Sequence, residues 1–380
     1  MQKIDGIPAD YTLTRWFLPI YEAYSVRQFP RSLDVPPAVR AVLNIVHNTA
    51  RVSPLQGDDG QLPKLQVERP TQGRKKAFIS FAGGKDALAV ALRARLDGYD
   101  VTLMYIQGVN KVVPSEGKAA EAVAREAGFP LVRLKLNIKG QKDFGEHPLK
   151  NVFILCLLID EGIKHGATAF GQGNVFEEDS EHSIIDDCLS DSYDMLHLWA
   201  RFMRQLIPGF THLQYLHDNL QAFYTVFRYA PATIPLLSTC NVGDFRRPMR
   251  RKYIAEHYGA DVLPAGGGCG GCYKCAMEFN NLVRFGLKRP NAKYQRFGAG
   301  LIATFKQSHR KKGAPAAMLY RPTGGVQVLR DVIGYYIGRM VQDERSGEWY
   351  VWDFFGHHHY AEREQAETIC SRFKSLYKLA

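Results

Sequence analysis

The sequence predicts an α/β protein built on a parallel sheet with helices on both faces. Three apolar segments of strand length, residues 76–81, 100–106 and 131–136, alternate with two segments of helical character, residues 86–96 and 116–128. Strand, helix, strand, helix, strand in about sixty residues is typical of a parallel sheet whose connecting helices cover it.

The chain continues this alternation further along. Residues 151–159 form an apolar run that predicts a buried helix, and residues 167–170 predict another strand. From residue 191 to residue 228, aromatic and aliphatic residues recur at helical spacing. Pro208-Gly209 divides that stretch into two predicted helices.

Changes in composition divide the chain into four predicted parts. Residues 1–73 are an N-terminal extension that ends in a polar stretch containing Gly, Pro and Gln. The α/β core follows over residues 74–235, and a cysteine-containing region follows over residues 236–296. The C-terminal extension, residues 297–380, contains a closing helix and strand-like pieces at residues 326–329 and 349–353.

Composition and charge limit the class of protein. Of 380 residues, 46% are hydrophobic and 23% are charged, which is average for a globular protein and argues against disorder. There is no run of eighteen apolar residues and no apolar signal segment, so we expect a cytoplasmic protein with no membrane partner. The net charge of +11 favours anionic partners, which include nucleotides, nucleic acids and acidic small molecules.

A glycine pair follows the first predicted strand of the core. Gly83 and Gly84 permit positive backbone dihedral angles and let a phosphate approach the main chain without a Cβ in the way. The helix that begins near Asp86 directs its free N–H groups and positive dipole end at such a phosphate, and Lys85 supplies a counter-charge. The alternative is an ordinary strand-to-helix turn. The Rossmann and Walker glycine motifs are both absent.

Three of the seven cysteines lie close together in the sequence. Cys269, Cys272 and Cys275 form two overlapping Cys-x-x-Cys pairs, which is a spacing typical of a zinc ion in a reducing compartment. A redox pair is the alternative. A tetrahedral site needs a fourth ligand, for which Cys240 is the first choice, followed by His257 and Cys188.

The segment from Ile79 to Ala87 resembles the PP-loop signature Ser-Gly-Gly-x-Asp-Ser, preceded by its apolar strand. That family has a five-stranded parallel sheet, cleaves ATP between its α- and β-phosphates and forms an adenylate. The resemblance implies ATP and Mg²⁺ as cofactors, with Lys85 and Asp86 as catalytic residues. Both signature serines are alanine here, which removes two hydroxyl donors. The implied ATP-binding residues are Ser80, Ala82, Gly83, Gly84, Lys85, Asp86 and Ala87.

The PP-loop and the later cysteine triplet together resemble the 7-cyano-7-deazaguanine synthases. Those enzymes convert 7-carboxy-7-deazaguanine, a queuosine precursor, into its nitrile with ATP and ammonia. Their fourth cysteine lies just before the triplet, whereas residues 261–268 contain none. The resemblance covers residues 75–290. It implies substrate-binding residues Asn151, Gly173, Asn174, Glu177 and Asp179, although the acidic residues there also fit a solvated loop.

Three functions stay open on the sequence alone. The first is a PP-loop ligase that adenylates a carboxylated 7-deazaguanine-like heterocycle and replaces AMP with an amine or ammonia. The second is a tRNA- or DNA-modifying PP-loop enzyme, and the third is a non-catalytic nucleotide-binding protein of a defence or phage system. A homodimer is also open. A basic cluster that fits ATP phosphates, a nucleic-acid or protein acceptor, or simply a solvated helix face comprises Arg246, Arg247, Arg250, Arg251 and Lys252.

Overall fold

A computed structural model describes most of the chain up to residue 304 and short parts of the remainder. The described residues are 3–24, 29–49, 52–67, 75–108, 115–139, 147–173, 193–213, 219–238, 240, 242, 244–304, 340–342, 349–353, 356–360, 364 and 367.

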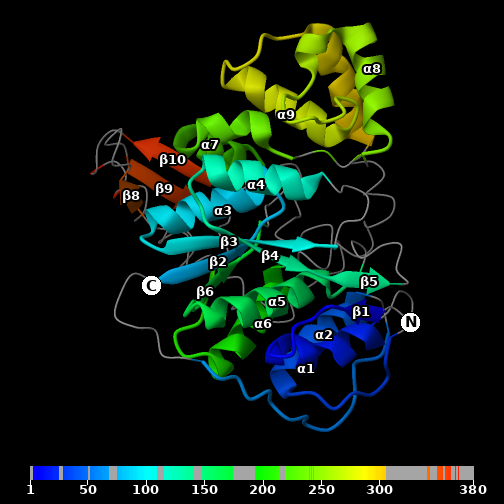
Figure 1. Cartoon of the computed structure of the whole chain (residues 1–380), viewed down its shortest axis with the longest axis vertical. Coiled ribbons are helices and arrows are strands. Elements are labelled where there is room, and N and C mark those ends of the chain that lie inside the picture. Colours follow the sequence, from blue (N-terminus) through cyan, green and yellow to red (C-terminus); the bar gives the residue numbers. More distant parts are fainter. Residues whose placement is uncertain are drawn as a thin grey trace.

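The centre of the molecule is a five-stranded sheet in which every pairing is parallel (Figure 1). The spatial order is β4-β3-β2-β6-β7, so the chain runs outward from β2 to β4 and then returns to the other side of β2. This confirms the predicted parallel sheet. The strands are β2 (Lys76–Ser80), β3 (Asp100–Gln107), β4 (Leu131–Lys135), β6 (Ala169–Gly171) and β7 (Thr211–Leu213).

The strand order reverses between β2 and β6, and such a reversal marks the edge of a parallel sheet where a ligand is expected to bind. In an open parallel sheet, the carboxyl ends of the two strands at such a switch point leave a crevice between their loops. Here the loop that follows β2 contains Gly83 and Gly84, and the loop that follows β6 contains Gln172 and Gly173. The fold therefore brings the glycine turn to the position where α/β proteins bind ligands.

Helices cover both faces of the sheet, as the sequence predicts (Figure 1). Alternate residues of β2 supply both interfaces, because Phe78 belongs to one hydrophobic core and Ile79 to the other. One face carries α3 (Lys85–Leu96), α4 (Glu116–Glu126) and α7 (Asn219–Tyr229). The other carries α5 (Lys150–Lys164) and α6 (Tyr193–Leu206), with α1 (Thr12–Ala23) and α2 (Pro37–Thr49) packed beneath them.

The N-terminal segment shares its hydrophobic core with α5 and α6. Its strand β1 (Lys3–Asp5) pairs antiparallel with β5 (Asn137–Lys139). The start of α1 has no side-chain cap of its own. Asp160 of α5 supplies one instead, accepting hydrogen bonds from the backbone N–H groups of Leu13 at 3.0 Å and Thr14 at 2.6 Å. The boundaries between the four predicted parts of the chain remain predictions.

Replacing Asp160 with alanine is expected to lower the free energy of unfolding by about 2 kcal/mol, because two buried N–H groups lose their acceptor. Urea denaturation followed by circular dichroism measures the change. The matched control is Glu126→Ala at the exposed end of α4, which is expected to change the stability little. Equal unfolding midpoints for the two variants would show that the remote cap contributes nothing.

The cysteine-containing region forms a helical layer beyond α4 and α7 (Figure 1). It has a small core of its own, made by Ile254, Val262, Phe279 and Tyr294. The short helix η3 (Pro231–Leu236) packs on α4 and α7 and leads into this layer. The elements of the layer are α8 (Arg247–Tyr258), η4 (Ala260–Val262), α9 (Tyr273–Arg284) and a further helix over residues 292–304.

The C-terminal extension contributes an antiparallel sheet of order β10-β9-β8. Its strands are β8 (Met340–Gln342), β9 (Trp349–Asp353) and β10 (Gly356–Tyr360), and β9 coincides with a predicted strand. The other predicted strand, residues 326–329, lies outside the described residues. Among the helices that the structure describes, none is long and apolar enough to cross a lipid bilayer.

Candidate nucleotide and metal sites

The glycine turn joins the carboxyl end of β2 to the start of α3. Ser80 ends the strand, Ala82 is exposed and Lys85 begins the helix. Gly83 has a φ of 84°, and a Cβ at this position would lie 2.9 Å from the backbone nitrogen of Ala120 in α4. Only glycine fits there, because both the dihedral angle and the close approach of α4 exclude a side chain.

Two further segments fix the position of this turn. A Cβ on Gly173, just after β6, would lie 2.5 Å from the backbone nitrogen of Ala87. The N–H group of Ser238 donates to the carbonyl of Gly83 at 2.9 Å. The cap residue of α3, Gly84, offers no side chain to the first N–H groups of the helix. These groups have no partner within the helix, so they are available to an anion.

The charged residues of the turn form an ion pair. The ammonium group of Lys85, which is buried, donates to the carboxylate of Asp86, which is partly exposed. The turn thus carries one charge of each sign at the N-terminus of α3. A phosphate can attract the lysine, and the carboxylate is the group open to a bound cation.

The structure describes two of the five substrate-binding residues that the resemblance implies. Asn151 is buried in the first turn of α5, and Gly173 contacts the glycine turn. The remaining three, Asn174, Glu177 and Asp179, lie outside the described residues.

Gln172 is a site residue that the sequence analysis missed. It follows β6 at the switch point and is only 6% exposed. Its side-chain nitrogen donates to the carbonyl of Asn151 at 2.9 Å, while its side-chain oxygen has no hydrogen-bond partner among the described residues. A buried acceptor without a partner is costly unless a ligand or water satisfies it. One polar residue in a loop gives no signal in the sequence.

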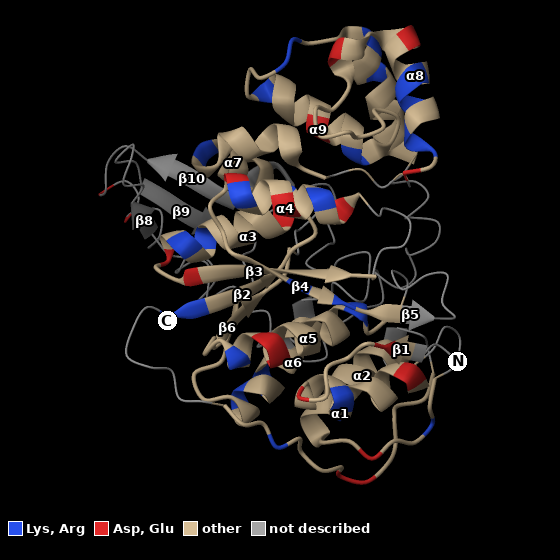
Figure 2. Cartoon of the chain, in the orientation of Figure 1, with Lys and Arg blue, Asp and Glu red and all other residues tan. Residues whose placement is uncertain are grey.

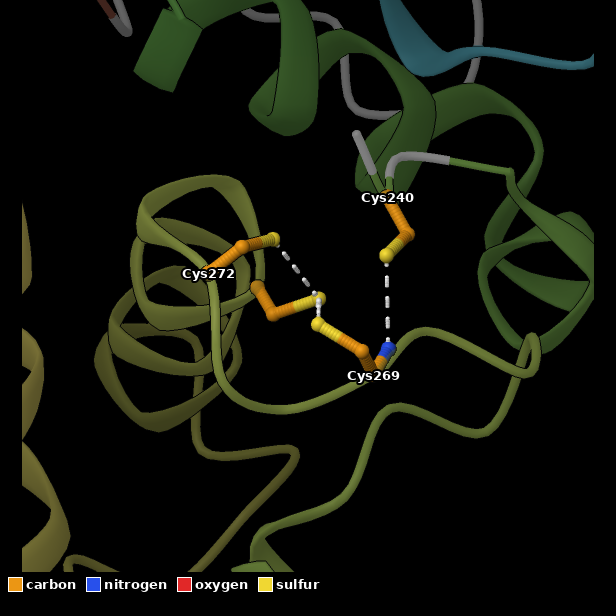
Figure 3. Close-up of side chains that lie close together, drawn as sticks. Cys240, Cys269 and Cys272 are labelled. Atoms are coloured by element: carbon orange, nitrogen blue, oxygen red, sulfur yellow. Dashed lines mark hydrogen bonds between the residues drawn. The ribbon is translucent and has the colours of Figure 1, made fainter. Parts of the chain in front are cut away.

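Four cysteines from two separate segments meet in one cluster. The Sγ atoms of Cys240, Cys269, Cys272 and Cys275 all lie within 4.8 Å of one another, and all four residues are buried. We call the segment from Cys269 to Cys275 the knuckle. In Figure 3, the side chain of Cys240 points toward the knuckle from a separate segment of the chain. The structure therefore brings together all four predicted cysteines. His257, a weaker candidate, is exposed and bonds the Tyr253 carbonyl at 2.8 Å, and Cys188 lies outside the described residues.

The geometry of the cluster fits a zinc ion. The Sγ atom of Cys275 lies 3.5 Å from that of Cys272 and 4.0 Å from that of Cys269. Four thiolates around zinc, with Zn–S bonds of about 2.3 Å, place their sulfur atoms about 3.8 Å apart. Gly270, with a φ of 69°, lets the knuckle turn. The four cysteines can hold one metal ion.

Backbone N–H groups support negative charge on the sulfur atoms. The N–H group of Cys269 lies 3.4 Å from the Sγ atom of Cys240, and the N–H group of Gly271 lies 3.3 Å from the Sγ atom of Cys269. Hydrogen bonds from the side chains of Cys269, Cys272 and Cys275 lower the pKa of Cys240 well below its usual range, and the hydrogen bonds to Cys240 raise the pKa values of Cys269 and Cys275. Thiolates are the form of cysteine that binds metal.

Two arginines of the basic cluster stabilise the fold of the knuckle through hydrogen bonds to backbone carbonyl groups. Arg251 donates to the carbonyl groups of Pro264, at 3.2 Å, and Gly268, at 2.6 Å. Arg250 donates to the carbonyl of Gly271 at 3.1 Å. The cluster is therefore more than a solvated helix face.

A polar network joins the cysteine region to the sheet. The Asp244 carboxylate accepts hydrogen bonds from the N–H and hydroxyl groups of Ser115, both at 2.9 Å. Arg247 pairs with Asp244 at 3.0 Å and donates to the Ser115 hydroxyl at 3.1 Å. Ser115 precedes α4, the helix that packs on Gly83. The cysteine cluster and the glycine turn are thus parts of one framework.

Comparison with known proteins adds little to this geometry. No family model and no curated protein matches the chain. Among solved structures, it is similar to a predicted subunit of tRNA methyltransferase from Methanocaldococcus jannaschii. The match has 20% sequence identity and a TM-score of 0.24, and covers 38% of this chain and 68% of that chain. At that similarity it supports no conclusion about this chain. A parallel sheet with a glycine turn at its switch point is nevertheless the architecture of α/β nucleotide-binding proteins.

Proposed function

We propose that this chain is a PP-loop enzyme that uses ATP to adenylate a carboxylate and releases pyrophosphate. The observation that carries the proposal is the position of the glycine turn. It lies at the switch point of the sheet, with Gly83 and Gly173 packed too closely for any side chain and the first N–H groups of α3 free of a side-chain cap.

The residues of the turn suit that chemistry. A carboxylate oxygen of the substrate attacks the α-phosphorus of ATP, and the bond to pyrophosphate breaks. Main-chain N–H groups from Gly83 to Ala87 hold the leaving phosphates, and Lys85 offsets their charge. Mg²⁺, when bound, neutralises phosphate oxygens, and Asp86 is the carboxylate positioned to hold it. An amine or ammonia then attacks the acyl carbon, and AMP leaves.

The substrate we propose is a carboxylated 7-deazaguanine or a related heterocycle. The support is the sequence resemblance, together with a four-cysteine cluster tied to the turn through Ser238, Ser115 and Asp244. The buried acceptor oxygen of Gln172 suits an N–H group of a planar base. Zinc held by four thiolates has no open coordination position, so its proposed role is to hold the knuckle.

Pyrophosphate release tests the proposal. The purified chain is incubated with ATP, Mg²⁺, ammonia and a panel of carboxylated deazapurines, and pyrophosphate is measured by a coupled enzyme assay. We expect release that depends on the carboxylate and is lost in Asp86→Ala. ATP binding without release from any member of the panel would favour the non-catalytic alternative, which the alanines at positions 82 and 87 suggest.

Restoring a serine at position 82 is expected to tighten ATP binding about tenfold, because a hydrogen bond to a charged oxygen contributes about 1.5 kcal/mol. Ala82 is exposed, so a hydroxyl fits without repacking. Isothermal titration calorimetry with an ATP analogue measures the change. Ala299→Ser, exposed in the helix over residues 292–304, is the control for an added hydroxyl away from the glycine turn. An unchanged affinity in Ala82→Ser would mean that the phosphates do not contact this part of the turn.

The second candidate is an enzyme that modifies tRNA or DNA, with a polynucleotide as acceptor. The observation that favours it is the exposed basic and aromatic face of α8, with Phe245, Tyr253 and Arg246. A homodimer also stays a prediction.

A further inference from the structure

Helix α8 exposes an apolar stripe on its outer face. Phe245, just before the helix, is 89% exposed, and Met249 and Tyr253 are 66% and 49% exposed. These residues are four apart, so they lie along one side of the helix at intervals of about 6 Å. The other large, strongly exposed hydrophobic residues in the described part of the chain are scattered singly, at Val52, Leu62 and Leu287. A contiguous exposed stripe is the kind of surface that marks an interaction site.

Helix α8 is also rich in Lys and Arg, which are blue in Figure 2. Arg246, Arg250 and Lys252 are exposed, and Glu256 is the one acidic residue of α8. Arg250 donates one of the five N–H groups of its guanidinium to the Gly271 carbonyl, so the others can bind a ligand. Arg246 and Arg250 therefore flank the apolar stripe on one side and Lys252 flanks it on the other, where Lys252 also pairs with Glu256 at 3.9 Å.

The aromatic ring of Tyr253 is held in place. It stacks on the ring of His257, with centroids 4.1 Å apart and an interplanar angle of 27°. The Nδ1 atom of His257 bonds the carbonyl of Tyr253 at 2.8 Å, which fixes the histidine ring beneath it. A supported flat ring loses little entropy when a ligand stacks on it.

We propose that the outer face of α8 binds single-stranded RNA. Unpaired bases stack on aromatic rings and phosphates pair with arginine and lysine, so a strand in which bases and phosphates alternate matches this face. RNA carries unpaired bases in stable loops, whereas the bases of duplex DNA are hidden in the stack. A second copy of the chain is a poor occupant, because two such faces would bring positive charges together.

The start of α8 is linked by a hydrogen bond to the segment that precedes α4, the helix packed on the glycine turn. Arg247, at the start of α8, bonds Ser115, which precedes the helix that packs on Gly83. RNA along α8 would thus lead toward the turn where an acyl adenylate forms. The role of RNA as the acceptor rests on the proposed function, whereas the binding of RNA to α8 does not.

Fluorescence anisotropy with a labelled, unstructured RNA of about 15 nucleotides tests the proposal. Binding is expected to weaken about 20-fold between about 50 and 200 mM salt, a log–log slope of about −2, because three cations meet phosphates. Phe245→Ala and Tyr253→Ala are each expected to weaken it about tenfold through lost stacking. Arg246→Gln with Lys252→Gln is expected to flatten the slope to about −0.7.

Leu62→Ala and Lys64→Gln, both exposed in the N-terminal segment, are the matched controls and are expected to bind as the parent does. Parent-like affinity in both aromatic variants, or absent RNA binding at low salt, would overturn the proposal. So would tighter binding of an acidic peptide or of single-stranded DNA. Pyrophosphate release from the small substrate, measured in the parent chain, separates the two proposals, because release without any RNA binding contradicts this one alone.

Discussion

Cys275→Ala is expected to remove the bound metal and to unfold the layer that contains α8 and α9. Cys275 is fully buried, and its sulfur lies 3.5 Å from that of Cys272 and 4.0 Å from that of Cys269. Three thiolates cannot close a tetrahedral site, and structural zinc in small domains supplies about 10 kcal/mol of folding free energy. The expected results are a metal content that falls from one zinc per chain to none, and fast hydrogen exchange over residues 244–304.

Cys156→Ala is the control for this prediction. Cys156 is a buried thiol of α5 that lies outside the cluster, so its replacement is expected to leave the metal content unchanged. Elemental analysis and hydrogen exchange with mass spectrometry measure both variants. A full zinc content in Cys275→Ala, or protected amides around α8 and α9 without metal, would show that the cluster does not hold this layer together.

Gly83→Ala is expected to abolish ATP binding and to destabilise the chain more than Gly98→Ala does. The two glycines have almost the same dihedral angle, φ of 84° and 85°, so they share the backbone cost of a left-handed alanine, about 1 kcal/mol. A Cβ on Gly98 meets nothing within 4 Å, whereas on Gly83 it lies 2.9 Å from the backbone of α4. The added crowding is expected to cost a further 1–3 kcal/mol or so.

Chemical denaturation and calorimetric titration with an ATP analogue measure the two glycine variants side by side. Moving the turn away from α4 displaces the N–H groups that are to hold the phosphates, so Gly83→Ala should lose affinity while Gly98→Ala keeps it. If both variants bound ATP as the parent does, the close packing of the turn would have no part in nucleotide binding.

The first half of the core was predictable because buried parallel strands are apolar on both faces. The segments at β2 and β3 show that pattern, whereas the edge strand β4 alternates, with Arg133 and Lys135 exposed. The connecting helices end at glycines or polar residues. Strand β7, Thr211–Leu213, was missed because three residues with a polar centre carry no strand pattern. Helix α5 runs past its predicted end at residue 159, because the helix continues beyond the apolar run into Asp160 and Glu161.

The two polar residues that end that apolar run bind the N-terminal segment, and only the structure shows this. Asp160 caps α1 and Glu161 accepts a hydrogen bond from Tyr11 at 2.7 Å, both at sequence separations of more than a hundred residues. Such contacts leave no local signal. The cysteine cluster did leave one, because the triplet spacing requires a fourth ligand and few candidates exist. The sequence also could not distinguish the roles of two arginines. Arg251 donates a hydrogen bond to the carbonyl of Gly268 beside the knuckle, whereas Arg246 is exposed to solvent.

A crystal structure of the chain with a non-hydrolysable α,β-methylene analogue of ATP and Mg²⁺ tests the central claim most directly. We expect the phosphate groups to lie within hydrogen-bond distance of the main-chain N–H groups between Gly83 and Ala87, with Lys85 turned from Asp86 toward them. Phosphates bound elsewhere, such as on Arg246 and Arg250, with the glycine turn empty, would contradict it.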